Sequence, residues 1–143
     1  MQYQRAQAIT FGKDAAMQAG TAAFEPEAII ASQLEAYNAR DIEAFMAFWH
    51  EDAQYFAHPS TLLANGAAEI RARHVGRFEE AALHGRLIGR FSVGTLVVDR
   101  EVVTRTFPEG PGQVDVIAIY EVEGGKIAKA WFKLGQPSFG GER

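Results

Sequence analysis

The pattern of hydrophobic and polar residues divides the chain into a helical first half and a strand-rich second half. Pro26 suits the first position of a helix, and helical spacing follows at Ile30 and Tyr37. Asp41 is a favourable N-cap for a second helix with apolar residues at i, i+3, i+4 and i+7. This apolar stripe consists of Ile42, Phe45, Met46 and Trp49. The sequence therefore predicts two amphipathic helices joined by a tight turn.

Weaker signals follow these two helices. Residues 54–58 alternate in polarity and predict a short strand, which ends before Pro59 because proline cannot donate a ladder hydrogen bond. Asn65 is a suitable cap for a third helix from residue 67 to about residue 80. The inward positions of that helix are Ala67, Ile70, His74 and Phe78.

The second half of the chain is rich in β-branched residues. It predicts strands over residues 87–98, 102–107, 114–122 and 127–134. Asp99 and Arg100 are interpreted as the turn between the first two strands. Helices followed by a meander of strands indicate an α+β domain.

Length and composition favour one domain. The chain has 143 residues, of which 48% are hydrophobic, enough for one core and too few for two. We assign residues 25–135 to this domain, residues 1–24 to an N-terminal extension and residues 136–143 to a loose polar tail.

Charge and cysteine content narrow the function classes. The 14 Lys and Arg residues against 18 Asp and Glu residues give a formal charge of −4, which disfavours nucleic acid and anionic membranes as partners. The absence of cysteine excludes disulfides and thiolate chemistry. Neither a secretory signal nor a membrane span is evident, so we expect a cytoplasmic protein.

The order of these motifs resembles a known superfamily. Its motifs match residues 38–44, residues 51–53, the helix opened by Gly66, and residues 120–127. The chain resembles the nuclear transport factor 2-like superfamily, in its SnoaL-like and ketosteroid-isomerase-like branch. This resemblance implies an α+β barrel or cone, in which a curved antiparallel sheet packs on three helices around an apolar pocket.

The resemblance also implies positions for catalytic groups. Steroid isomerases of this fold use a helix tyrosine, an aspartate base before a proline, and a protonated strand acid, and Gln33, His58 and Ala118 occupy these positions here. Because Ala118 cannot donate a hydrogen bond, the unaltered isomerase mechanism is not expected. His58 is the leading candidate for a general base, since imidazole titrates near neutral pH. A bulge would instead turn His58 away and bring Ala57 inward.

Other residues are secondary candidates. Tyr37 lies one turn beyond Gln33 and has a phenol that can donate to a substrate oxygen, although a tyrosine at such a position is more often part of the core. Asp115 is an acid in an apolar strand, but its parity places it outward if Ala118 faces inward. Arg71, Arg73 and Arg77 are interpreted as part of a solvated helix face. The predicted substrate-binding residues are Gln33, Tyr55, His74, Ala118, Tyr120 and Phe132.

Two functions remain open at this stage. The first is a cofactor-independent isomerase, cyclase or lyase that acts on a hydrophobic small molecule by general acid/base chemistry. The second is a noncatalytic domain that binds a hydrophobic ligand or partner. No histidine spacing indicates a metal site, and no phosphate-binding motif is present. Because both faces of residues 114–122 are apolar, we expect a homodimer formed through the outer face of the sheet.

Overall fold

The computed structural model describes residues 25–140, so the predicted N-terminal extension and residues 141–143 lie outside the described part. The helices are α2 (Pro26–Ala39), α3 (Ile42–Met46) and α4 (Ala67–Val75), and the 3-10 helix η2 (Arg77–Glu79) follows α4. The strands are β1 (Trp49–Ala57), β2 (Thr61–Asn65), β3 (His84–Val93), β4 (Leu96–Phe107), β5 (Gly110–Glu123), β6 (Lys126–Leu134) and β7 (Ser138–Phe139).

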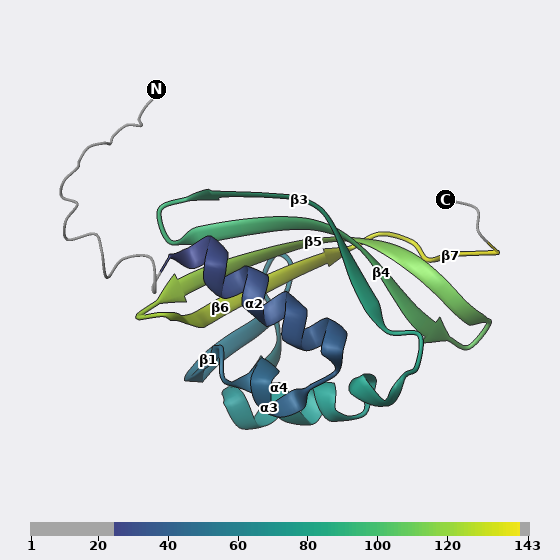
Figure 1. Cartoon of the computed structure of the whole chain (residues 1–143), viewed down its shortest axis with the longest axis horizontal. Helices are drawn as coiled ribbons and strands as arrows, with labels where there is room; N and C mark the ends of the chain where they lie inside the picture. Colours follow the sequence, from purple (N-terminus) through teal and green to yellow (C-terminus); the bar gives the residue numbers. More distant parts are fainter. Residues whose placement is uncertain (1–24, 141–143) are drawn as a thin grey trace.

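The strands form one curved sheet, and the helices lie on one side of it (Figure 1). Its order is β2-β1-β6-β5-β4-β3, with β7 paired to β5. The predicted α+β fold with a curved sheet on three helices is therefore confirmed. The sheet is mixed, because β1 and β6 run parallel while the other pairs are antiparallel. It also stays open, with β2 and β3 at its edges, so the implied barrel does not close.

Local signals explain the helix boundaries. Pro26 occupies the first turn of α2, and Arg40 ends that helix in the left-handed conformation with φ of 55°. The Asp41 side chain caps α3 by accepting a hydrogen bond from the Ala44 N–H at 3.1 Å. The second helix is shorter than predicted: it ends at Met46, and Trp49 already begins β1 beside Ile127 of β6.

Three features of the strand region differ from the prediction. Residues 61–65 form β2, which the sequence did not indicate. The turn between β3 and β4 lies at Gly94, with φ of 58°, so Asp99 and Arg100 stand inside β4 and do not form the turn. The tail is not loose throughout, because Ser138–Phe139 pair with Gly112 and Gln113 of β5.

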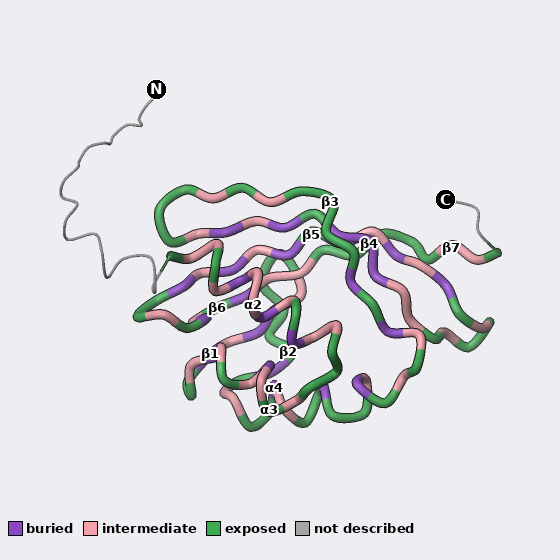
Figure 2. Tube along the Cα trace, in the orientation of Figure 1, coloured by how far each residue is buried: buried purple, intermediate pink, exposed green. Residues whose placement is uncertain are grey.

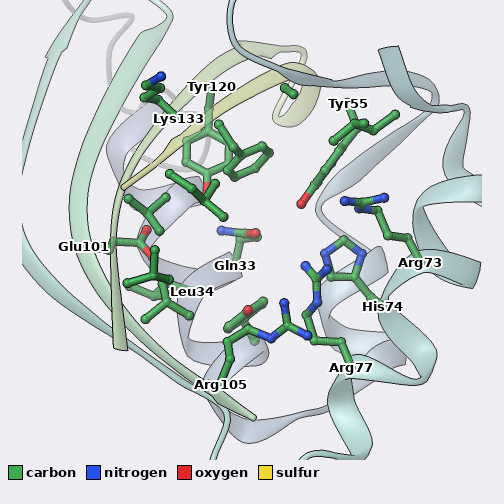
Figure 3. A pocket seen from close by; sticks show the side chains of 18 of the residues that line it. Gln33, Leu34, Tyr55, Arg73, His74, Arg77, Glu101, Arg105, Tyr120 and Lys133 are labelled. Atoms are coloured by element: carbon green, nitrogen blue, oxygen red, sulfur yellow. The ribbon is translucent and has the colours of Figure 1, made fainter. Parts of the chain in front are cut away.

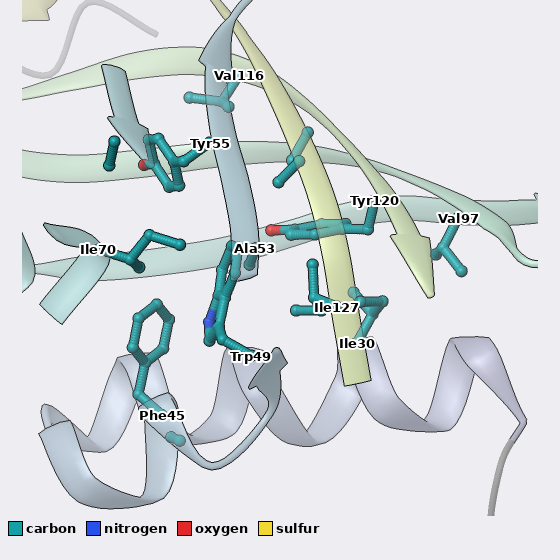
Figure 4. Close-up of a cluster of buried hydrophobic side chains, with 14 of the residues drawn as sticks. Ile30, Phe45, Trp49, Ala53, Tyr55, Ile70, Val97, Val116, Tyr120 and Ile127 are labelled. Atoms are coloured by element: carbon teal, nitrogen blue, oxygen red, sulfur yellow. The ribbon is translucent and has the colours of Figure 1, made fainter. Parts of the chain in front are cut away.

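The core lies between the helices and the sheet (Figure 4). Trp49 is 2% exposed, and its ring centroid lies 5.7 Å from that of Phe45. Along the central strand β5, buried residues alternate with half-buried or exposed ones (Figure 2). In β5 this alternation turns Val116 and Tyr120 toward the core and leaves Ile117 exposed, as the predicted parity requires.

A row of apolar side chains crosses the opposite, outer face of the sheet. Phe56 pairs with Trp131, and their rings stack with centroids 5.8 Å apart. Register then connects Trp131 to Ile119, Ile119 to Val98, and Val98 to the exposed Phe91. The row therefore spans five strands without a polar interruption. Among residues 25–140, no helix combines the length and apolar character that crossing a membrane requires.

Candidate functional site

A cavity of about 400 Å³ lies between the helices and the inner face of the sheet. Its walls are largely apolar and aromatic, with contributions from Phe45, Trp49, Val114, Val116 and Phe132. Polar side chains from both layers converge on the same space (Figure 3). A cavity of this size is at the lower end of the range of about 300–1,000 Å³ that is typical of small-molecule sites.

Glu101 of β4 places a carboxyl group on the wall of the cavity, although its side chain is only 6% exposed. Gly85 of the neighbouring strand makes room for it, because a Cβ atom at Gly85 would lie 3.2 Å from Glu101 Oε1. Burial raises the pKa of Glu101 to about 7, and the charge of Asp99 and a hydrogen bond with Asp99 act in the same direction. Glu101 therefore exchanges a proton near neutral pH.

Asp99 is hydrogen-bonded to the Glu101 carboxyl group. It is fully buried two residues before Glu101, on the same face of β4. Arg90 of β3 binds both Asp99 oxygens, with Nε 2.7 Å from Oδ1 and Nη2 2.8 Å from Oδ2. This bidentate pair holds Asp99 in one orientation, so Asp99 is a positioning residue for Glu101.

Gln33 and Tyr120 form a second polar group in the cavity. Gln33 of α2 is 4% exposed, and its amide is hydrogen-bonded to the Tyr120 hydroxyl. Burial raises the pKa of Tyr120 well above its ordinary value, with smaller contributions from Glu101 and Asp99. The Tyr120 hydroxyl therefore stays protonated and can donate a hydrogen bond. Both residues were predicted to bind substrate, and the structure brings them together.

Tyr37, Tyr55 and His74 complete the polar lining near the helices. Burial raises the pKa of Tyr37 to about 12, so this phenol also remains a donor. His74 is 2% exposed, and its Nδ1 lies 2.8 Å from the Ile70 carbonyl oxygen. Burial lowers the pKa of His74 to about 4, with Arg77 and Arg73 acting in the same direction. His74 is thus neutral at physiological pH.

The structure separates the leading candidate His58 from the secondary candidate Asp115. His58 lines the cavity but is exposed beyond the end of β1, so it lies at the mouth of the cavity, while Ala57 and Tyr55 line its interior. Asp115 is outside the cavity: its carboxylate lies 2.9 Å from Arg100, and its side chain is 41% exposed. Ala118 is buried in the sheet and does not line the cavity, whereas the predicted Phe132 does.

Three arginines line the cavity, and the sequence did not place them there. Arg71 belongs to the solvated helix face, as predicted, and is paired with Glu43. Arg73 is exposed, as the solvated-face interpretation expected, and Arg77 is half-buried, but both also line the cavity. Arg105 of β4 also lines it, and its guanidinium is bound to Glu80, with Nη2 2.7 Å from Oε2.

Sequence reasoning missed Glu101 because the predicted turn at Asp99 removed it from a strand. The signal that would have found it is the spacing of Val97, Asp99, Glu101 and Val103, which places all four on one face once β4 is continuous. Gly94 was the better turn residue, because its positive φ is readily adopted by glycine.

Comparison with known proteins gives the family. The SnoaL-like domain family matches residues 30–130, which is more than half of the chain. This chain belongs to the SnoaL-like domain family. A comparison with curated proteins gave no significant match.

Solved structures share the SnoaL-like fold. An uncharacterized cystatin-fold protein from Novosphingobium aromaticivorans is 26% identical, with a TM-score of 0.67 over 73% of this chain and 94% of that one. An LEH-like epoxide hydrolase from M. tuberculosis is 15% identical, with a TM-score of 0.68 over 80% and 84%. IdmH from Streptomyces antibioticus, a candidate polyketide cyclase, is 19% identical, with a TM-score of 0.65 over 77% and 91%.

The chemistry available to this SnoaL-like domain is proton transfer in an apolar site. Glu101 can give or accept a proton, and the Tyr120 and Tyr37 hydroxyls can donate hydrogen bonds to a substrate oxygen. Within residues 25–140, no three His, Asp or Glu side chains are grouped closely enough to hold a metal ion.

Proposed function

We propose that this SnoaL-like domain is an isomerase, cyclase or lyase that moves a proton on a hydrophobic substrate containing a carbonyl group, with Glu101 as the general acid and base. The observation that carries this proposal is the position of Glu101: its buried carboxyl lines the cavity and is hydrogen-bonded to Asp99, which Arg90 holds in turn. A fixed carboxyl in an apolar cavity is a recurrent arrangement for removing a proton next to a carbonyl group.

In the proposed reaction, the Glu101 carboxylate takes a proton from the carbon next to the carbonyl. The C–H bond breaks, its electron pair forms an enolate, and the Glu101 carboxyl holds the proton. The Tyr120 hydroxyl, kept protonated by burial and bound to Gln33, donates a hydrogen bond to the enolate oxygen. Return of the proton to another carbon of a conjugated enolate completes an isomerisation. Alternatively, the enolate carbon attacks a second carbonyl in a cyclisation: a C–C bond forms, the C=O π bond breaks, and the resulting alkoxide takes the proton from the Glu101 carboxyl.

His58 is the alternative general base. It lines the mouth of the cavity, where its exposed ring can meet only the outer part of a bound molecule. Glu101 is better suited because the surrounding walls exclude water, which strengthens the electrostatic effects on a developing charge. The two assignments predict opposite results for variants at these positions.

The fold of IdmH, a candidate polyketide cyclase with a similar structure, favours the cyclisation branch of the proposal. The largely aromatic and apolar walls of the cavity favour a second function, noncatalytic binding of a hydrophobic ligand. Convergence of Glu101, Gln33 and Tyr120 argues for catalysis, because buried polar groups are unfavourable for binding a purely hydrocarbon ligand.

The experiment that tests the proposal measures exchange of α-protons for deuterium by NMR in D₂O. The probes are 2-tetralone and cyclohexanone, two ketones of different size. The wild-type protein should accelerate exchange of at least one ketone, and Glu101→Gln should lower the rate by about 10² or more, as loss of a general base usually does.

His58→Ala is the matched control in this experiment, because His58 also lines the cavity. We expect it to retain most of the exchange rate. Loss of exchange in His58→Ala, with Glu101→Gln as active as wild type, would assign the base to His58. No acceleration by the wild-type protein with either ketone would contradict catalysis and favour the binding function.

A further inference from the structure

We propose that Arg73 and Arg77 bind a carboxylate group of the ligand, so that the molecule taken by the cavity is an amphipathic carboxylate with a hydrophobic body. This inference rests on the proposed function only in using the same cavity, and it specifies the substrate class. Arg73 in α4 and Arg77 in η2 are four residues apart, and both line the cavity (Figure 3).

The first observation is that these two arginines lack carboxylate partners in the described part of the chain. Other arginines of the described chain are paired with carboxylates: Arg105 with Glu80, Arg90 with Asp99, and Arg71 with Glu43. No ion pair within residues 25–140 includes Arg73 or Arg77. Two guanidinium groups without a carboxylate partner among the described residues therefore line the cavity, in a protein whose formal net charge is −4.

The second observation concerns the surroundings of each guanidinium group. The Arg73 guanidinium carbon lies 5.3 Å from the centre of the Tyr55 ring, a cation–π contact. The Nε atom of Arg77 is buried without a hydrogen-bond partner among the described residues. A guanidinium presents its donors in a planar fork that matches a carboxylate, so a bound carboxylate would supply acceptors at this site.

The third observation is that the charges of Arg73 and Arg77 act on buried side chains of the cavity wall. Burial is the main cause of the lowered pKa of His74, and the charges of Arg77 and Arg73 lower it further. Burial raises the pKa of Tyr37, and the charge of Arg77 opposes this rise in part. Since His74 is neutral and its Nδ1 is engaged by Ile70, it supplies no competing charge. The arginines therefore dominate the charge on the helical side of the cavity.

The opposite wall suits the other end of such a ligand. Glu101 lies on β4, across the cavity from α4, with Gln33 between the two sides in Figure 3. A ligand whose carboxylate contacts the arginines would extend its hydrophobic body along Phe132 and Val116 toward Glu101. The carboxylate would then fix the orientation in which the reacting carbon meets Glu101.

The test compares two probes of similar shape by isothermal titration calorimetry, namely 2-naphthylacetate and the neutral 2-naphthaleneethanol. Wild-type protein should bind the carboxylate about tenfold or more tightly than the alcohol, the scale of one charge-assisted hydrogen bond. Arg73→Gln and Arg77→Gln should each reduce this preference, and the double variant should abolish it while still binding the alcohol. Retained binding of the alcohol also shows that the variants fold.

Arg71→Gln is the matched control, because Arg71 lies on the same helix but is paired with Glu43 and does not line the cavity. It should keep the full preference for the carboxylate. Equal affinity of the two probes in wild type, no binding of either at millimolar concentration, or a preference that survives the double variant would overturn the inference. The proposed catalytic role is tested separately by deuterium exchange, so its failure would leave this binding result unchanged.

Discussion

Glu101 makes stability depend on pH in a direction that is unusual for a carboxyl group. Its pKa is raised from 4.5 to about 7 in the folded protein, so folding favours the protonated form. A raised pKa contributes stability that is complete below the unfolded value and is lost as pH rises through the folded value. The wild-type protein therefore loses this contribution between about pH 4.5 and pH 7.

Glu101→Gln should remove this loss, because glutamine stays neutral throughout. Relative to wild type, the variant should gain on the order of 3 kcal/mol in free energy of unfolding between pH 4.5 and pH 8. Urea unfolding across that pH range measures the difference, and the opposite effect of His74 cancels because both proteins contain it. Glu109→Gln, at an exposed glutamate, is the matched control for the substitution itself. A constant difference between Glu101→Gln and wild type would contradict the raised pKa.

Individual residues were predictable where one local rule determined them. The parity of β5 placed Asp115 outward, where the structure has it, and the family resemblance placed Gln33 at a position that lines the cavity. Glu101 and Arg73 were missed for a different reason: their positions depend on where a turn falls and on how one helix crosses the sheet. Tertiary packing decides both of these, and charged residues carry no apolar pattern to reveal them.

Elements were predicted best where periodicity was strong. The apolar stripe in residues 42–49 correctly identified Phe45 and Trp49 as buried. It did not predict that α3 ends at Met46, because the first residue of a strand after a tight turn can face the same side as the preceding helix. The short strands β2 and β7 exist through pairing with β1 and β5, which their own residues do not encode.

A substitution at Trp49 tests the packing of α3 against the sheet, because Trp49 is the first residue of β1 and follows α3 closely. Its ring packs between Phe45 and Tyr55, with centroids 5.7 and 5.9 Å away. Trp49→Ala should lower the free energy of unfolding by ~3 to 5 kcal/mol, as truncation of large core residues does. Chemical denaturation measures this, and a cost below about 1 kcal/mol would show that the residue is not part of the core.

At the scale of the whole molecule, the apolar row on the outer face of the sheet is consistent with a covering subunit. We propose that the protein is a homodimer through this face, with Ile117 and Ile119 buried between subunits. Ile117 is 42% exposed and Phe91 63% exposed in the single chain. Contiguous apolar surface of this kind is unusual on a monomer.

Light scattering at micromolar concentration should therefore give twice the mass of one 15.7 kDa chain. Ile119→Glu should weaken the dimer by several kcal/mol, because it places an unpaired charge in a desolvated contact. Glu79→Lys, at an exposed position in η2 on the helical side, should leave the mass unchanged. The mass of a single wild-type chain at that concentration would contradict the dimer.

The pH dependence of α-proton exchange in 2-tetralone tests most directly whether Glu101 is the general base in this cavity. With Glu101 as the base, the wild-type rate should rise with pH through about 7, as the carboxyl ionises. Glu101→Gln should have a low rate without this rise, and His58→Ala should keep it. The same rise in Glu101→Gln, or its loss in His58→Ala alone, would contradict the account.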